Sequence, residues 1–134
     1  MSYETAAQLA IFAALDGNIS GLTIYDDVPM LPDGTPDANF PYAVIGDDTL
    51  NAWDTDDKTG AKISVYIHFW SRYAGMSEVK AKMGLAYDLL HRARLTAAGY
   101  NVIDILREFS DVSVDPDGKT RHGVQRYILT IQEN

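Results

Sequence analysis

The sequence contains no cysteine among its 134 residues. Disulfide bridges, thiol nucleophiles and thiolate metal ligands are therefore all excluded. No apolar run approaches the roughly 20 residues that a membrane-crossing helix requires. No basic residue precedes the mildly apolar segment Ala6–Leu15, which argues against a signal peptide. We therefore expect neither a membrane partner nor redox chemistry at sulfur.

Basic residues are absent from the first part of the chain. Residues 1–57 contain eleven Asp or Glu and no Lys or Arg, a charge of -11. Residues 58–134 contain eleven basic and eight acidic residues, a charge of +3. This distribution argues against a nucleic-acid reader, which neutralises phosphates with clustered cations. It fits either a solvated acidic surface or a charge pattern that selects partners and repels polyanions.

Length, composition and periodicity predict one α+β domain spanning residues 1–134. The hydrophobic fraction of 46% and the charged fraction of 22% are typical of globular chains. A Pro-rich loop over Pro29–Asp37 and the turn Asp115-Pro116-Asp117-Gly118 separate the periodic segments. We expect a mainly antiparallel four- to five-stranded sheet with two helices packed on one face. The expected elements are a helix capped by Ser2 and ending near Leu15, strands over 22–28, 40–48 and 62–70, a helix over 77–95 with Arg92 and Arg94 in its last turn, and strands over 102–114 and 123–132.

The strand over 62–70 alternates cleanly between two kinds of side chain. Ile63, Val65, Ile67 and Phe69 share one face, which we expect to lie in the core. Tyr66, His68 and Trp70 share the other face with Lys62 and Ser64. That face is too polar for a core and too aromatic for an ordinary wet surface. It predicts a docking surface, with a small enzymatic or ligand-binding site as the alternative.

The segment before this strand is acidic and contains a tryptophan. Trp53 either folds back over a sheet edge or anchors a contact, since Trp and Tyr dominate binding hot spots. The acids over 47–57 have no cation before Lys58, so we expect them to face a channel lumen, a basic partner or a cation of a neighbouring copy. The predicted interface residues are Trp53, Asp54, Asp56, Asp57, Tyr66, His68, Trp70 and Tyr73.

The sequence offers no recognisable catalytic or metal-binding pattern. Its three histidines, His68, His91 and His122, do not lie at ligand spacing. The acidic segment over 54–60 departs from a calcium loop because Lys58 occupies a ligand position and a late Glu is missing. Neither a nucleophile elbow nor a phosphate-binding loop is present. We therefore predict no enzyme, no cofactor and no metal site.

Several landmarks in order resemble one known family. They are Ile24-Tyr25 leading to Val28-Pro29, the strand Phe40–Gly46, the run Ile67–Ser71 followed by a Gly and Glu78-Val79, and the 115–118 turn leading into Arg121-His122-Gly123-Val124. The sequence resembles the tail-completion, or tail-terminator, proteins of long-tailed bacteriophages and gene transfer agents. Each motif alone is common; their order and spacing over nearly the whole chain carry the resemblance.

The resemblance implies a structural virion protein made in the host bacterial cytoplasm. Such a subunit forms a ring, typically of six copies, that ends the tail tube at its head-proximal end and joins it to the head connector. The implied partners are further copies, the tail tube protein and a connector or stopper protein, while DNA passes through the lumen without specific binding. The alternative within this class is another connector component, a stopper or adaptor. The Pro29–Asp37 loop is longer than such a turn needs, which suggests a partner-binding arm or a lineage insertion.

Overall fold

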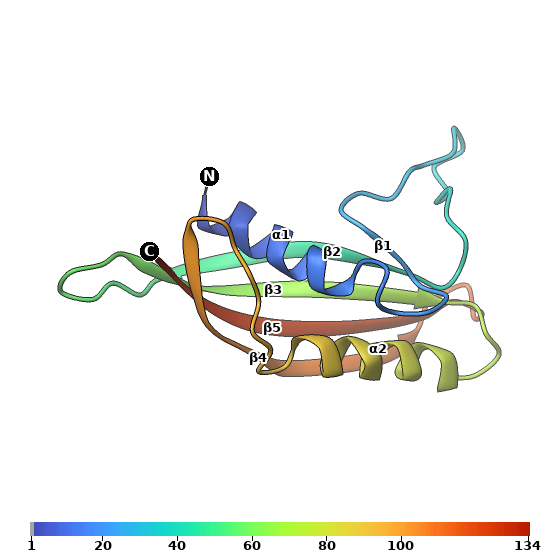
Figure 1. Ribbon diagram of the computed structural model, residues 1–134. Coiled ribbons are helices and arrows are strands. Elements are labelled where there is room, and N and C mark those ends of the chain that lie inside the picture. Colours follow the sequence, from blue (N-terminus) through green and yellow to red (C-terminus); the bar gives the residue numbers. More distant parts are fainter. Residues whose placement is uncertain (1) are drawn as a thin grey trace.

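A computed structural model describes residues 2–134 and contains two helices and five strands. The strands form one sheet in the order β1-β2-β3-β5-β4, in which only the β1–β2 pair is parallel. Both helices lie on the same face of this sheet (Figure 1), so the predicted α+β architecture is confirmed. The elements are α1 (Tyr3–Leu15), β1 (Thr23–Tyr25), β2 (Tyr42–Ala52), β3 (Gly60–Ser71), α2 (Ser77–Leu90), β4 (Tyr100–Val114) and β5 (Arg121–Glu133).

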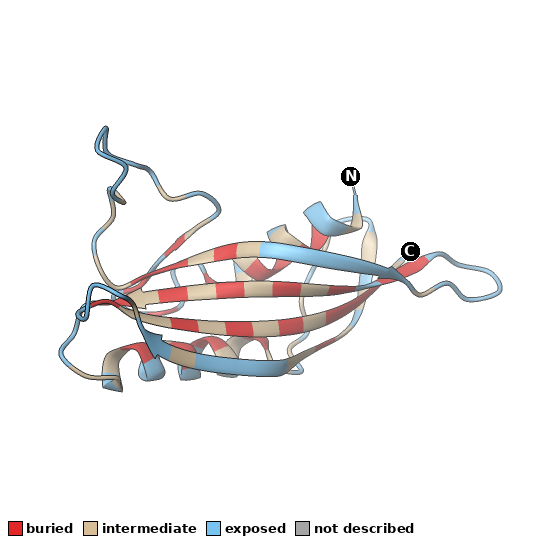
Figure 2. Cartoon of the chain, turned by 180° about the vertical axis from the view of Figure 1, so that it is seen from behind, coloured by how far each residue is buried: buried red, intermediate tan, exposed pale blue. Residues whose placement is uncertain are grey.

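The core lies between the helices and the two central strands. Alternate residues of β3 and β5 point towards the helices and are buried, which produces the banded strands of Figure 2. Phe69 is 1% exposed, whereas Trp70 next to it lies on the opposite face and is half-buried. The predicted register of this strand is therefore confirmed. Gly123 of β5 lets α2 approach closely, because a side chain there would overlap Met83.

The first helix begins as expected. The Ser2 side chain accepts a hydrogen bond from the Thr5 amide at 3.1 Å and so caps the helix. The predicted strand over 22–28 was too long, because only Thr23–Tyr25 pair with β2. The predicted end of the next strand at residue 48 was too early. β2 continues to Ala52 after a bulge between Ile45 and Asp48, so the hairpin loop covers only 53–59.

The predicted end of the second helix was also wrong. α2 ends at Leu90, and Arg92 adopts a left-handed backbone with φ of 56°. The Arg92 amide donates to the Ile105 carbonyl of β4 at 2.7 Å, which ties the chain to the sheet edge. Arg92 and Arg94 therefore lie beyond the helix and not in its last turn.

Two segments project from opposite ends of the sheet (Figure 1). The β2–β3 hairpin loop over 53–59 extends at one end. The Pro-rich segment extends at the other and folds on itself, since the Leu31 amide donates to the Thr35 carbonyl at 2.8 Å and the Asp37 amide to the Pro29 carbonyl at 2.6 Å. This segment is a compact arm outside the sheet, as the sequence predicts for a loop.

Candidate interaction surface on the open sheet face

The sheet face opposite the helices carries stacked rings from three strands. Cross-strand pairing places Trp70 of β3 between Tyr42 of β2 and His122 of β5. The Trp70 ring stacks on Tyr42 with 5.3 Å between centroids and on His122 with 4.8 Å between centroids and 1° between planes. Such stacks exist because the register aligns alternating aromatic positions on one face.

The stack continues across the sheet through a histidine pair. His68 Nδ1 and His122 Nε2 are 2.9 Å apart and share a hydrogen bond. The Tyr66 ring lies 6.5 Å from that of His68, and Arg126 Nη1 donates to the Tyr66 hydroxyl at 3.1 Å. We call the side chains of Tyr42, Tyr66, His68, Trp70, His122 and Arg126 the aromatic strip.

At its far end the aromatic strip meets β4. Arg126 forms an ion pair with Glu108, and its guanidinium lies 5.2 Å from the centre of the Phe109 ring. Phe109 is 42% exposed. The strip thus runs over three strands and contacts a fourth, and it combines large rings with polar tips, a composition that is enriched in protein interfaces.

Burial in the strip favours the neutral forms of the His68 ring and the Tyr42 hydroxyl. Burial lowers the pKa of His68, and the neighbouring His122 lowers it further, against an opposing effect of Asp47. Burial also raises the pKa of the Tyr42 hydroxyl. Asp115 Oδ1 lies 4.0 Å from His122 Nδ1. The strip is an aromatic surface with a polar, titratable centre.

The structure brings together three of the predicted interface residues and adds others. Tyr66, His68 and Trp70 share the open face as predicted. The sequence interpretation missed His122, which it placed simply after a turn, and Tyr42. The alternation of the strand that follows His122 was the available signal, because extending it by one position places His122 on the face of Val124.

The other predicted residues lie elsewhere. Trp53 is half-buried against the backbone of Gly60 at the end of the β2–β3 hairpin, its amide donating to the Gly60 carbonyl at 3.0 Å. Asp54 Oδ1 accepts the Gly60 amide at 3.0 Å, whereas Asp56 and Asp57 are exposed in the same loop. Tyr73, 54% exposed, follows β3 at the opposite end of the sheet. The eight residues therefore occupy three separate places.

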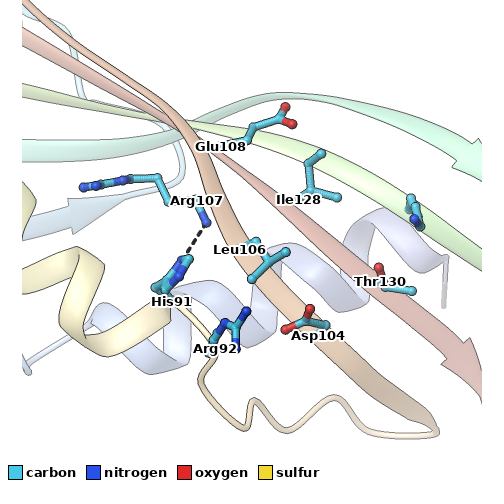
Figure 3. Close-up of a pocket in the computed structure, with 9 residues that line it drawn as sticks. His91, Arg92, Asp104, Leu106, Arg107, Glu108, Ile128 and Thr130 are labelled. Carbon is cyan, nitrogen blue, oxygen red and sulfur yellow. Dashed lines mark hydrogen bonds between the residues drawn. The ribbon is translucent and has the colours of Figure 1, made fainter.

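A hollow of about 440 Å³ lies where the end of α2 meets β4 (Figure 3). Its lining mixes both charges: Lys62, Arg92 and Arg107 with Asp104 and Glu108. Within residues 2–134, no group of three His, Asp or Glu side chains is arranged to hold a metal ion. Over the same residues, no helix is long and apolar enough to cross a membrane.

The fold places the chain among small α+β domains whose helices cover one face of a mainly antiparallel sheet. The chain belongs to the family described as tail completion protein gp17, whose family model matches residues 8–132. The resemblance stated from the sequence is thereby confirmed.

A phage protein and a chain of a gene transfer agent particle are among the proteins similar to this chain. It is 27% identical to the tail completion protein gp17 of Bacillus phage SPP1 over 100 residues, which cover 73% of this chain and 72% of the phage protein. It also shares its fold with a chain in the virion of a native gene transfer agent particle. That match has a TM-score of 0.82 at 20% identity and covers 98% of this chain and 99% of the other.

Proposed function

We propose that this protein is a structural component of a phage or gene transfer agent particle that completes the tail. In this proposal, copies form a ring of six at the head-proximal end, stop growth of the tail tube and join the tail to the head connector. The observation that carries the proposal is the family match over residues 8–132, nearly the whole chain. Its role is assembly, and no residue is assigned to catalysis.

The charge distribution supports a ring through which DNA passes. The eleven acids of residues 1–57 lie in α1 and β2, in the two projecting segments and in the turns that follow α1 and β1, without one Lys or Arg among them. A lumen lined by part of this acidic surface repels the phosphate backbone and lets DNA move without binding. The aromatic strip provides a contact surface for the tail tube protein or a connector protein.

Deletion of the gene followed by imaging of the particles tests the proposal. We expect tails of irregular and excessive length, with DNA-filled heads that remain unattached. Supplying the wild-type gene on a plasmid should restore tails of normal length. The ring extracted from such particles should have a mass of about six times the 14.8 kDa of one chain.

Two results would contradict the proposal in different ways. Normal tails joined to heads in the deletion strain would remove any role in tail completion. Tails of normal length that remain detached from heads would instead point to a stopper or adaptor, because length control would then be independent of this protein.

A further inference from the structure

The outer edge of β2 is only partly covered. β1 pairs with Tyr42–Val44, and the rest of that edge has no neighbouring strand. The Trp53 amide donates a hydrogen bond to the Gly60 carbonyl of β3. In an antiparallel pair, every second residue bonds to the partner strand, so the N–H and C=O groups of Asp48, Leu50 and Ala52 point away from β3. Among residues 2–134, no hydrogen bond reaches these outward groups. We call residues 48–52 the bare stretch of β2.

The outer edge of β4 is covered in its middle and bare near its end. The Ile105 carbonyl accepts from the Arg92 amide at 2.7 Å, and the Arg107 amide donates to His91 Nδ1 at 3.0 Å (Figure 3). Beyond the bulge between Arg107 and Phe109, residues 110–114 form a second bare stretch. Figure 2 shows both outer strands exposed along these parts.

The same alternation identifies the outward groups of this second stretch. The Asp115 amide bonds to the Thr120 carbonyl across the β4–β5 turn. Because every second residue of β4 bonds to β5, the N–H and C=O groups of Ser110, Val112 and Val114 point away from β5. No hydrogen bond from elsewhere in residues 2–134 reaches them. The two bare stretches have equal length and lie at diagonally opposite corners of the sheet.

We propose that these stretches pair with each other between copies, so that β4 of one copy adds to β2 of the next and the sheet continues around the ring. This inference rests on the proposed ring. An unpaired edge is a template for another strand, and one edge meeting a different edge gives the head-to-tail contact that closes a ring. The proposed register places Ser110 opposite Ala52, Val112 opposite Leu50 and Val114 opposite Asp48.

Strand direction agrees with this pairing. Three antiparallel pairs, β2–β3, β3–β5 and β5–β4, connect the two outer strands, so β4 runs antiparallel to β2 within one chain. A copy rotated about a ring axis keeps that relation, so the junction is antiparallel. Because the two stretches lie at opposite corners, each junction displaces the next sheet along its strands. Closed sheets require such a stagger and the strand tilt that accompanies it.

The ends of the junction also fit. β4 stops at Val114 and turns away, which leaves room for β1 of the next copy on Tyr42–Val44. At the other end of the junction, the β2–β3 loop over 53–59 of the next copy, which contains Asp56 and Asp57, lies alongside the covered part of β4. Arg92 and Arg94 are exposed there. The occupant is therefore a second copy, whose acidic loop complements the cations beside β4.

At the centre of the junction, the side chains on the helix side are apolar. Leu50 is 38% exposed and Val114 is 45% exposed in the single chain. The proposed register brings Leu50 beside Val112 and within reach of Val114. Pairing thus covers apolar side chains that the isolated subunit leaves in water, which favours association.

Engineered cysteines test the register, because the chain has none of its own. Thr49 and Ser113 would face each other between copies as a pair without mutual hydrogen bonds, with Cα atoms about 4.5 Å apart, which is within disulfide reach. Within one chain β3 and β5 separate their strands, so the two residues are at least about 14 Å apart at the usual strand spacing. Particles carrying Thr49→Cys with Ser113→Cys are purified, oxidised and run on a non-reducing gel.

We expect a ladder of covalent multimers of this chain from the double variant. Each single variant should remain monomeric, and the shifted pair Thr49→Cys with Asp111→Cys should cross-link at least tenfold less. Particles that contain the protein and join heads to tails but give no ladder would overturn the edge pairing while leaving the ring intact. Covalent dimers from Ser113→Cys alone would show a symmetric contact and overturn it as well. Absence of the wild-type protein from purified particles would instead refute the proposed function.

A proline on the bare edge provides an independent test. Leu50→Pro removes an outward amide and leaves the hydrogen bonds to β3 intact, and edge strands tolerate proline at such positions. Leu50→Ala is the matched control for loss of the side chain. We expect Leu50→Pro to fold, by circular dichroism, yet to reduce head–tail joining at least tenfold relative to Leu50→Ala. Equal joining by the two variants would overturn the proposal.

Discussion

Alanine at Phe69 and at Trp70 should separate folding from assembly, because these neighbours lie on opposite faces of β3. Phe69 is 1% exposed and packs under the helices. Removing a buried phenyl ring costs about 3–5 kcal/mol, since the core cannot close fully around the space. Against a typical domain stability of about 5–15 kcal/mol, Phe69→Ala should unfold at much lower urea concentration and accumulate poorly.

Trp70→Ala removes two cross-strand ring stacks, on Tyr42 and His122, and one stack within β3, on His68, from a face that is open to solvent. Each aromatic pair contributes about 0.5–1.5 kcal/mol, so we expect the two cross-strand pairs to account for a loss of about 1–3 kcal/mol. No enclosed cavity forms, which keeps this loss below that of Phe69→Ala. Head–tail joining should nevertheless fall more than stability alone explains, because a central ring of the contact surface is missing.

The two effects are measured separately. Urea unfolding is followed by far-ultraviolet circular dichroism, which does not depend on the tryptophan signal, and joining is measured by complementation of the deletion strain. Leu85→Ala is the control, since Leu85 is 43% exposed on α2 and lies outside both the core and the open sheet face. If Trp70→Ala destabilises the chain as much as Phe69→Ala, or joins heads to tails like wild type, the assignment of the open face to assembly is wrong.

Four further variants address packing, pH and charge. Gly123→Ala should cost about 1–3 kcal/mol in urea unfolding by overpacking against α2, and an unchanged midpoint would show that the helix can shift. The folded-state pKa of His68 lies below 6.5, so stability should fall as pH drops from 6.5 towards that pKa. His68→Gln should reduce this loss in thermal melts between pH 7 and 5, and parallel curves would contradict the assignment. Hydrogen bonds from Thr120 lower the pKa of Asp117 to about 2. The ionised Asp117 carboxylate should therefore stabilise the folded protein above pH 3.8, and this contribution should be lost as pH falls to about 2. Thermal melts of Asp117→Asn should lack the contribution at every pH. Asp56→Asn with Asp57→Asn should weaken assembly at low salt more than at high salt. If assembly of the variant and of the wild type depends on salt concentration in the same way, these acids make no contact in the assembly.

The central strand was predictable because its two faces differ so clearly. Four apolar positions alternate with polar and aromatic ones, and burial on one face determines the register. The end of α2 was not predictable, because helical spacing continues through Ala93. Two hydrogen bonds to β4, at Arg92 and His91, end the helix there, and they depend on tertiary contact. The lengths of β1 and β2 were misjudged for the same reason, since strand ends depend on the neighbour available.

The candidate site shows the same division. The face shared by Tyr66, His68 and Trp70 follows from alternation within one strand. His122 joins them only because β5 pairs with β3, although more than fifty residues separate the two histidines in the chain. The sequence interpretation considered spacing along the chain and therefore saw three unrelated histidines. Cross-strand neighbours become visible only when the order of strands is known.

The strand order also has a consequence for how the protein is made. β5 follows every other element in the chain but lies inside the sheet, between β3 and β4. Until the ribosome releases β5, β4 has no partner and β3 has only β2. Such non-local pairing slows folding relative to local pairing. The nascent chain therefore holds an incomplete sheet through most of its synthesis, and the sheet becomes continuous from β1 to β4 in one late step.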